Sequence, residues 1–283
     1  MEFVTLRNGV QMPMVGFGTY PLKGKQLENL LITASHSGYQ LIDTATAYSN
    51  EQDIRNVIND SNRDSFFITS KVGSIVLKGR RKYLWLNKKS LTKAFEDSCE
   101  KLGVHYIDAY LLHQPFEGCV RHYKELMNLY NQGRVRVIGV SNFNEEELQQ
   151  LYDQCGEYPM INQTEISPFN TQDDLVNFCK SHNIVVEAYS PFGRGKLVQS
   201  LLSNEILKSM ANKYKRTVGQ IVLRWIVQRG IVVIARSTNE ERIAENINVF
   251  DFSLSEEDMY KISSLNSNIV YGINQVNKKT VKL

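Results

Sequence analysis

Seven short apolar runs of this chain each end in a polar residue that can take part in chemistry. Runs this apolar are typical of strands that are buried on both faces, as in a parallel sheet. In a (β/α)8 TIM barrel, polar groups at the carboxyl ends of successive strands build the active site. The runs and the residues that end them are 39–42 with Asp43, 66–70 with Lys71, 109–112 with His113, 135–140 with Ser141 and Asn142, 160–162 with Gln163, 184–188 with Tyr189, and 231–235 with Arg236.

Strand and helix patterns alternate along nearly the whole chain, after an N-terminal β-hairpin. Residues 3–6 and 10–12 flank Asn8-Gly9, a dipeptide that favours tight hairpin turns. The strand ends lie roughly thirty residues apart on average, which is the length of one β-plus-α unit. The gap between Tyr189 and Arg236 holds two helix patterns, so an extra helix is expected near the C-terminus. Helices are expected over 87–102 with Asn87 as the cap, and over 145–155, 171–181, 204–213 and 218–228.

The length and the glycine pattern favour one α/β barrel domain over residues 1–283. A chain of 283 residues fits a (β/α)8 barrel, whose usual size is about 250 residues. No linker rich in proline, glycine or serine divides the sequence. An open doubly wound sheet is the alternative, but its dinucleotide version needs the pattern G-x-G-x-x-G. The third glycine is missing after Gly16-Phe17-Gly18, so the barrel is favoured.

Composition limits the partners of the protein. The net charge of +3 is too small to indicate nucleic-acid binding, and the basic run 78–82 is expected to be a solvated loop. No stretch approaches the roughly 20 apolar residues of a membrane span, and residues 1–5 lack the features of a signal peptide. The four scattered cysteines predict neither a disulfide framework nor a metal site. We expect a cytoplasmic monomer that binds small molecules, not nucleic acid or membrane.

Four of the polar residues have complementary chemistry. Asp43 beside Lys71 would keep the lysine charged, and the ammonium would favour the phenolate of Tyr48 and lower its pKa. His113 could orient or polarise a substrate oxygen. Taken alone, each residue also fits an ordinary structural role, as a buried ion pair, a core histidine or a loop tyrosine. Their joint position at neighbouring strand ends favours a general acid for a carbonyl substrate.

Four longer motifs stand out in the sequence: DTATAYSNE at 43–51, LGVHYIDAYLLHQP at 102–115, GVSNF at 139–143 and EAYSPFG at 187–193. They resemble the signatures of the aldo-keto reductase superfamily, in particular its short aldose and aldehyde reductase members. The resemblance implies NADPH-dependent reduction of aldehydes or ketones to alcohols, with hydride from the nicotinamide and a proton from Tyr48. It also implies a catalytic tetrad of Asp43, Tyr48, Lys71 and His113.

The resemblance further implies a dinucleotide site without a Rossmann domain. Ser141, Asn142 and Gln163 would bind the nicotinamide carboxamide, and Tyr189 would stack on the ring. Helix capping before residue 145 is the alternative role for Ser141 and Asn142. The other residues that the resemblance places around the cofactor are Gly18, Thr19 and Asp43 near the nicotinamide, Ser190 and Phe192 at the pyrophosphate, Arg236, Ser237 and Arg242 at the adenosine 2′-phosphate, and Glu245 and Asn246 at the adenine.

One segment departs from the pattern of the family. The usual I-P-K-S reads Ile234-Ala235-Arg236-Ser237. Arginine keeps the charge but changes the reach of the side chain, and the loss of proline is expected to loosen the exit of the strand. NADPH stays favoured over NADH as the cofactor, although this change puts the ratio between them in doubt.

Short loops predict an open substrate pocket. Residues 114–118 alone separate His113 from the next helix pattern, and the tail after Leu265 is short and ends in the basic stretch 278–282. Tyr20, Trp85 and Phe116, with His113, are candidate wall residues of a pocket for small or varied aldehydes, with ordinary loop packing as the alternative. A second functional class is a dinucleotide-binding, redox-sensing or channel-associated module, and a third is a structural protein on the same fold. The intact tetrad favours the enzyme.

Overall fold

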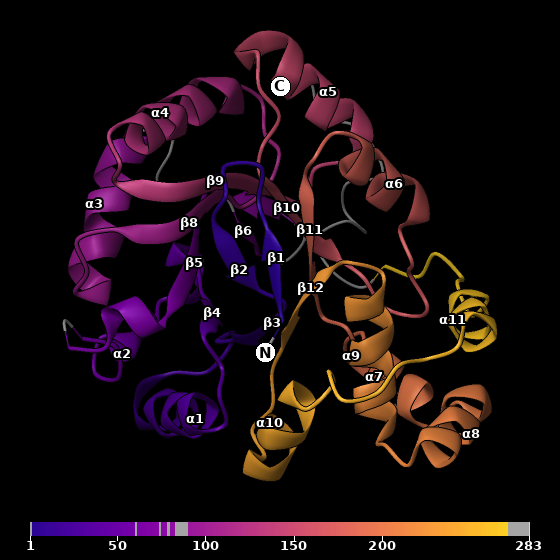
Figure 1. Ribbon diagram of the computed structural model, residues 1–283. Helices are drawn as coiled ribbons and strands as arrows, with labels where there is room; N and C mark the ends of the chain where they lie inside the picture. The colour runs from indigo at the N-terminus through magenta and orange to yellow at the C-terminus, as the bar shows by residue number, and fades with distance from the viewer. Residues whose placement is uncertain (1, 60, 74, 78–79, 83–89, 271–282) are drawn as a thin grey trace.

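Eight parallel strands close into a barrel in the computed structural model, and helices surround it (Figure 1). The structure describes residues 2–59, 61–73, 75–77, 80–82, 90–270 and 283; for 75–77 and 80–82 it describes the backbone. The predicted (β/α)8 fold is confirmed. In barrel order the strands are β10 (Ile161–Glu165), β11 (Val185–Tyr189), β12 (Val232–Ala235), β3 (Val15–Gly18), β4 (Leu41–Asp43), β5 (Phe67–Val72), β8 (Ile107–Leu112) and β9 (Val135–Ser141).

Each of the seven expected apolar runs forms a barrel strand, and the eighth strand, β3, was not singled out from the sequence. Glycines at positions 16 and 18 dilute its apolar pattern. Gly16 is required by packing, because a Cβ there would lie 2.6 Å from side-chain carbons of Leu41 and Ile234 on the two neighbouring strands. The glycine that dilutes the apolar pattern of β3 therefore also lets this strand fit between its two neighbours in the closed barrel.

Amphipathic helices cover the outside of the barrel and pack their apolar faces on the strands. The long gap after β11 holds three helices (α7, α8 and α9) where two helix patterns were expected. The expected cap at Asn87 is wrong, because α3 begins at Leu91 and Ser90 accepts a hydrogen bond from the Lys93 amide; Asn87 itself lies outside the described residues. The helices are α1 (Gly24–His36), α2 (Glu51–Ile54), α3 (Leu91–Leu102), α4 (Cys119–Asn131), α5 (Glu145–Cys155), α6 (Asp173–Ser181), α7 (Lys196–Leu202), α8 (Glu205–Tyr214), α9 (Val218–Gln228), α10 (Glu240–Ile247) and α11 (Glu256–Ser263).

The N-terminal hairpin, β1 (Phe3–Thr5) and β2 (Gln11–Pro13), lies across the centre of the barrel in the view of Figure 1. Its turn is fastened by Asn8, which donates to the carbonyl of Arg136 over 2.9 Å near the start of β9. Two of its apolar side chains, Leu6 and Met12, are buried. Because the hairpin precedes β3, it closes the amino-terminal end of the barrel, and the polar strand ends face the opposite end.

A second hairpin, β6 (Ile75–Leu77) and β7 (Arg80–Lys82), follows β5. Part of the expected basic loop 78–82 and the basic stretch 278–282 lie outside the described residues. Within the described part of the chain, no helix is both long and apolar enough to cross a membrane.

Candidate active site

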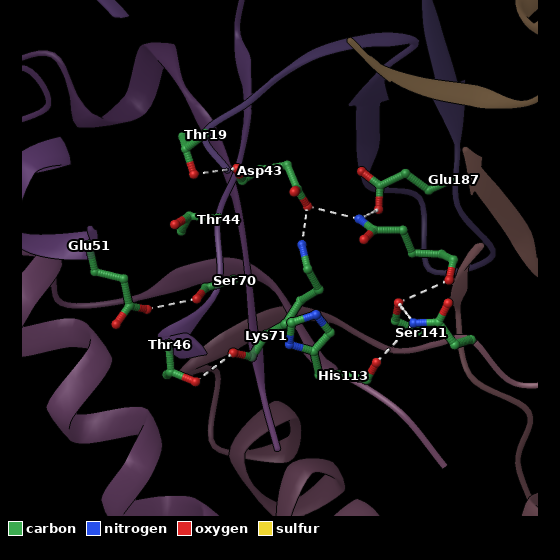
Figure 2. A network of polar contacts seen from close by, with 12 residues as sticks. Thr19, Asp43, Thr44, Thr46, Glu51, Ser70, Lys71, His113, Ser141 and Glu187 are labelled. Carbon is green, nitrogen blue, oxygen red and sulfur yellow. Dashed lines mark hydrogen bonds and ion pairs between the residues drawn. The ribbon is translucent and has the colours of Figure 1, made fainter. Parts of the chain in front are cut away.

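A buried ion pair lies at the carboxyl ends of two adjacent strands. Lys71 on β5 is fully buried, and its ammonium donates to Oδ1 of Asp43 on β4, which is 4% exposed. Figure 2 shows the lysine side chain pointing at this carboxylate. His113 follows the next strand, β8, and its amide donates to the carbonyl of Val72 over 2.8 Å. Three of the predicted tetrad residues therefore meet at one end of the barrel.

Tyr48 reaches the same place from the loop after β4. It ends the 3-10 helix Thr46–Tyr48, and the Thr46 hydroxyl fastens this turn to β5 by donating to the carbonyl of Lys71 over 3.0 Å. The Lys71 Nζ lies 5.4 Å from the centroid of the Tyr48 ring. The centroids of the Tyr48 and His113 rings are 5.8 Å apart. All four predicted tetrad residues are thus brought together.

The local electrostatics keep the phenol and the imidazole neutral. Burial raises the pKa of Tyr48 to about 12, Lys71 acts to lower this pKa, and Asp43 acts to raise it. Lys71 therefore acts on the Tyr48 pKa in the predicted direction, but burial outweighs the ammonium and the net shift is upward. Burial, aided by Lys71, lowers the pKa of His113 to about 3. Burial acts to lower the pKa of Lys71, but Asp43, Tyr48 and Glu187 together raise it.

Gln163 on β10 connects the ion pair to a second buried acid. Its Nε2 donates to Asp43 Oδ1 over 2.8 Å and to Glu187 Oε2 over 2.7 Å. Glu187 was not singled out from the sequence as a site residue, although a charged residue inside the apolar run 184–188 is a readable signal. A carboxyl group in a strand that is buried on both faces must have polar partners or a shifted pKa.

Asn142 and Tyr189 form a fixed polar contact beside the tetrad. Asn142 follows β9 with a backbone φ of 66°, and its Nδ2 donates to the carbonyl of His113 over 3.1 Å and to Ser141 Oγ over 2.9 Å. The Tyr189 hydroxyl donates to Asn142 Oδ1 over 2.7 Å. Helix capping is instead the role of Asn144, which forms a capping box with Glu147 at the start of α5. The capping alternative for Ser141 and Asn142 is therefore wrong.

The loop after β11 begins with Ser190, whose φ is 52°. Arg194 Nε donates to the Ser190 hydroxyl over 2.8 Å, and the Arg194 guanidinium lies 5.4 Å from the centroid of the Tyr189 ring. Phe192 is half-buried and Asn246 is buried. Both flank Gly219 at the start of α9, because a Cβ there would lie 3.8 Å from Phe192 Cζ and 3.6 Å from Asn246 Oδ1.

The segment after β12 presents two exposed guanidinium groups, Arg236 and Arg242. Asn239 caps α10 by accepting from the Arg242 amide over 2.9 Å, and the Ser237 hydroxyl accepts from the Asn239 amide over 3.0 Å. Ala235 is buried, ends β12 and is paired with Phe17 of β3.

Three acidic residues lie near these arginines in the sequence. Glu240 and Glu241 stand in the first turn of α10, and Glu245 follows one turn later. Two arginines and three glutamates give the segment no excess of positive charge. Direct contact with a guanidinium group is the way in which this segment could bind a phosphate.

The expected wall residues differ in how they lie. Tyr20 is 53% exposed, and its ring centroid is 5.0 Å from that of Tyr48. Phe116 is only 3% exposed, and its ring packs on His122 with 5.7 Å between centroids. Trp85 lies outside the described residues. Thr19 is fully buried, and its hydroxyl donates to the carbonyl of Asp43 over 3.0 Å, so it fastens the loop after β3 to β4.

Comparison with known proteins identifies the family. The family model described as the aldo/keto reductase family matches residues 14–267. The chain belongs to the aldo/keto reductase family. The predicted superfamily, and with it an oxidoreductase acting on carbonyl compounds, is thereby confirmed.

Two curated relatives and one solved structure show how far this aldo/keto reductase resembles known proteins. It is 41% identical to 9,11-endoperoxide prostaglandin H2 reductase of Trypanosoma cruzi over 270 residues, which cover 93% of this chain and 91% of that protein. It is 39% identical to glyoxal reductase of Bacillus subtilis over 280 residues, with 96% of each protein covered. The crystal structure of the Bombyx mori aldo-keto reductase in complex with NADP has a TM-score of 0.85 and 32% identity, with 98% of this chain and 97% of that chain covered.

Lys71→Met is expected to destabilise the barrel, because it leaves the buried Asp43 carboxylate without its cation. Removing one partner of a buried ion pair costs about 3–5 kcal/mol, and urea titration should show a loss of about that size in the free energy of unfolding. The double variant Lys71→Met/Asp43→Asn removes both charges and should recover part of the loss. A single variant as stable as the wild type would contradict the pairing.

Proposed function

We propose that this aldo/keto reductase reduces aldehydes and ketones to alcohols with NADPH, and that Tyr48 supplies the proton. The observation that carries the proposal is the Lys71 ammonium, held by Asp43 at 5.4 Å from the centre of the Tyr48 ring. The names of the relatives, glyoxal reductase and prostaglandin H2 reductase, support carbonyl reduction. Solved relatives in complex with NADP and with NADPH support the cofactor.

The residues beside the tetrad fit a nicotinamide dinucleotide. A carboxamide needs donors and acceptors, which the side chains of Ser141, Asn142 and Gln163 supply. Asn142 Oδ1 accepts one hydrogen bond from Tyr189 and has the capacity for a second. The half-buried Tyr189 ring offers a flat aromatic face, and Arg236 and Arg242 offer guanidinium groups for a phosphate. When bound, the dinucleotide supplies the hydride.

Tyr48, Lys71 and His113 divide the proton chemistry. The phenol is protonated at neutral pH, since burial holds its pKa at about 12, so it can serve as a general acid. As the substrate oxygen gains negative charge, the O–H bond of Tyr48 breaks and the proton moves to that oxygen. The Lys71 ammonium stabilises the phenolate that remains. Neutral His113 positions the carbonyl oxygen by hydrogen bonding.

The substrates of this site are small or varied aldehydes, including α-oxoaldehydes. The connection from β8 to α4 is short, since α4 begins at Cys119 only six residues after His113. Tyr20 is exposed next to Tyr48. A short connection and an exposed aromatic wall favour an open pocket over one closed around a single bulky ligand. The name of the Bacillus subtilis relative, glyoxal reductase, agrees with this choice.

Tyr48→Phe is expected to lower kcat by about 100- to 10,000-fold, the usual contribution of a positioned general acid. The dissociation constant for NADPH, measured by fluorescence quenching, should stay close to that of the wild type. Tyr123→Phe is the matched control, because Tyr123 is a buried tyrosine on α4, outside the barrel, and its hydroxyl has no hydrogen-bond partner among the described residues. A Tyr48→Phe enzyme with wild-type turnover would rule Tyr48 out as the proton donor.

Arg242→Ala is expected to raise KM for NADPH by about 10- to 100-fold, since hydrogen bonds to charged groups contribute roughly 1.5–3 kcal/mol. KM for NADH should change little, because NADH lacks the 2′-phosphate. Arg216→Ala serves as the control, since Arg216 pairs with Asp251 over 2.6 Å. Equal changes for both cofactors would remove Arg242 from the phosphate site, and steady-state kinetics with each cofactor decides.

A further inference from the structure

Glu187 is a buried carboxyl group that the proposed proton transfer leaves without a role. It lies on β11 next to Gln163 of β10 in the strand register, and none of its surface is exposed. Figure 2 shows it on the opposite side of the network from Glu51, near the pair of Asp43 and Lys71. An isolated carboxyl group in such a place costs several kcal/mol, so its surroundings must explain why the fold keeps it.

A single amide group joins Glu187 to the ion pair. Both protons of Gln163 Nε2 are taken, one by Asp43 Oδ1 at 2.8 Å and one by Glu187 Oε2 at 2.7 Å. This arrangement fixes which end of the Gln163 amide faces the carboxyl groups and which end is left for other partners. Glu187 Oε1 has no hydrogen-bond partner among the described residues, so Glu187 can hold a proton there without breaking the contact with Gln163.

The charges around Glu187 come from two strands. Burial is the main cause that raises its pKa, to about 8; Asp43 on β4 raises it further, and Lys71 on β5 acts to lower it. Gln163 on β10 donates a hydrogen bond to it, and β12, the other neighbour of β11, pairs Val232 with it and carries no charged residue. Glu187 is also among the groups that raise the pKa of Lys71.

We propose that Glu187 is a positioning residue that couples the cofactor-binding amide of Gln163 to the proton chemistry of Lys71 and Tyr48. It holds the Gln163 amide in one orientation, and its ionisation changes the charge beside Lys71. The proposal rests on the reductase function proposed above. Glu187 acts through Gln163 and Lys71 and touches neither the substrate nor the reacting atoms.

The sign of the effect follows from the charges. Ionised Glu187 adds a negative charge near Lys71, which offsets the pull of the ammonium on the Tyr48 phenolate. Tyr48 therefore keeps its proton to higher pH when Glu187 is ionised than when it is neutral. A group that cannot ionise at position 187 should let Tyr48 lose its proton at lower pH.

Glu187→Gln tests this coupling, because glutamine keeps an acceptor for Gln163 and cannot ionise. The alkaline limb of carbonyl reduction should move to lower pH by about one unit, the size expected for one charge several ångströms away. The rising limb of alcohol oxidation with NADP⁺ should move in the same direction, because that reaction needs the phenolate. Superimposed pH profiles for wild type and variant would overturn the proposal.

Glu51→Gln is the matched control. Glu51 is also a buried carboxyl group with a pKa raised mainly by burial, but it accepts from Ser70 over 2.8 Å, and Lys71 is not among the groups that shift it. Its replacement should leave both pH profiles in place. A shift equal to that of Glu187→Gln would make the effect a general result of removing a buried acid and would overturn the coupling.

Glu187→Asp separates the positioning effect from the charge and serves if the glutamine variant does not fold. Aspartate stays ionisable but withdraws its carboxyl group from Gln163 by one methylene. The wild-type pH profile should persist while KM for NADPH rises several-fold, and an unchanged KM would overturn the positioning role. A wild-type protein that reduces none of the tested aldehydes with NADPH would instead contradict the proposed function, so the two failures are distinguishable.

Discussion

The buried ion pair of Lys71 and Asp43 is the interaction on which the site depends. It places one fixed positive charge at the carboxyl end of the barrel, where burial keeps water from screening it. The ammonium opposes the effect of burial on Tyr48 and helps to keep His113 neutral. Asp43 also accepts from Gln163, so the pair also holds the amide that we propose to bind the nicotinamide. The proposed proton donor and the proposed cofactor-binding amide thus depend on one ion pair.

The barrel places the residues proposed for proton transfer and those proposed to bind the cofactor on different strands. Asp43, Lys71 and His113 stand at three consecutive strands, β4, β5 and β8, while Gln163 lies within β10 and Tyr189 ends β11. The N-terminal hairpin occupies the opposite end of the barrel. Loops at the carboxyl end can therefore change without loss of the core, as in other barrels of this type.

Much of the fold could be predicted from the sequence, because parallel strands are buried on both faces and leave apolar runs that are easy to read. Helices α5 and α9 begin and end as expected, since capping residues mark them. Strand β3 was not predicted because it contains glycines, which are needed there to leave room for the neighbouring side chains of Leu41 and Ile234. Packing of this kind depends on residues that are distant in sequence, which local patterns do not report.

The sequence predicted which residues form the candidate site better than it predicted the pKa shifts of those residues. The polar strand ends indicated Asp43, Lys71 and His113, but the direction of the Tyr48 pKa shift depends on burial, which no motif states. Glu187 was overlooked, although a charged residue inside an apolar run is a readable signal. Asn142 keeps its place through contacts with His113, Ser141 and Tyr189, which only the closed barrel brings together.

The most direct test of NADPH-dependent carbonyl reduction is a steady-state assay of the wild-type protein with small aldehydes, in which the absorbance of NADPH reports its consumption. We expect aldehyde-dependent oxidation of NADPH with the matching alcohol as product, faster with methylglyoxal than with bulky steroid ketones. Tight NADPH binding with no turnover of any aldehyde would contradict it and would favour a dinucleotide-binding module on the same barrel.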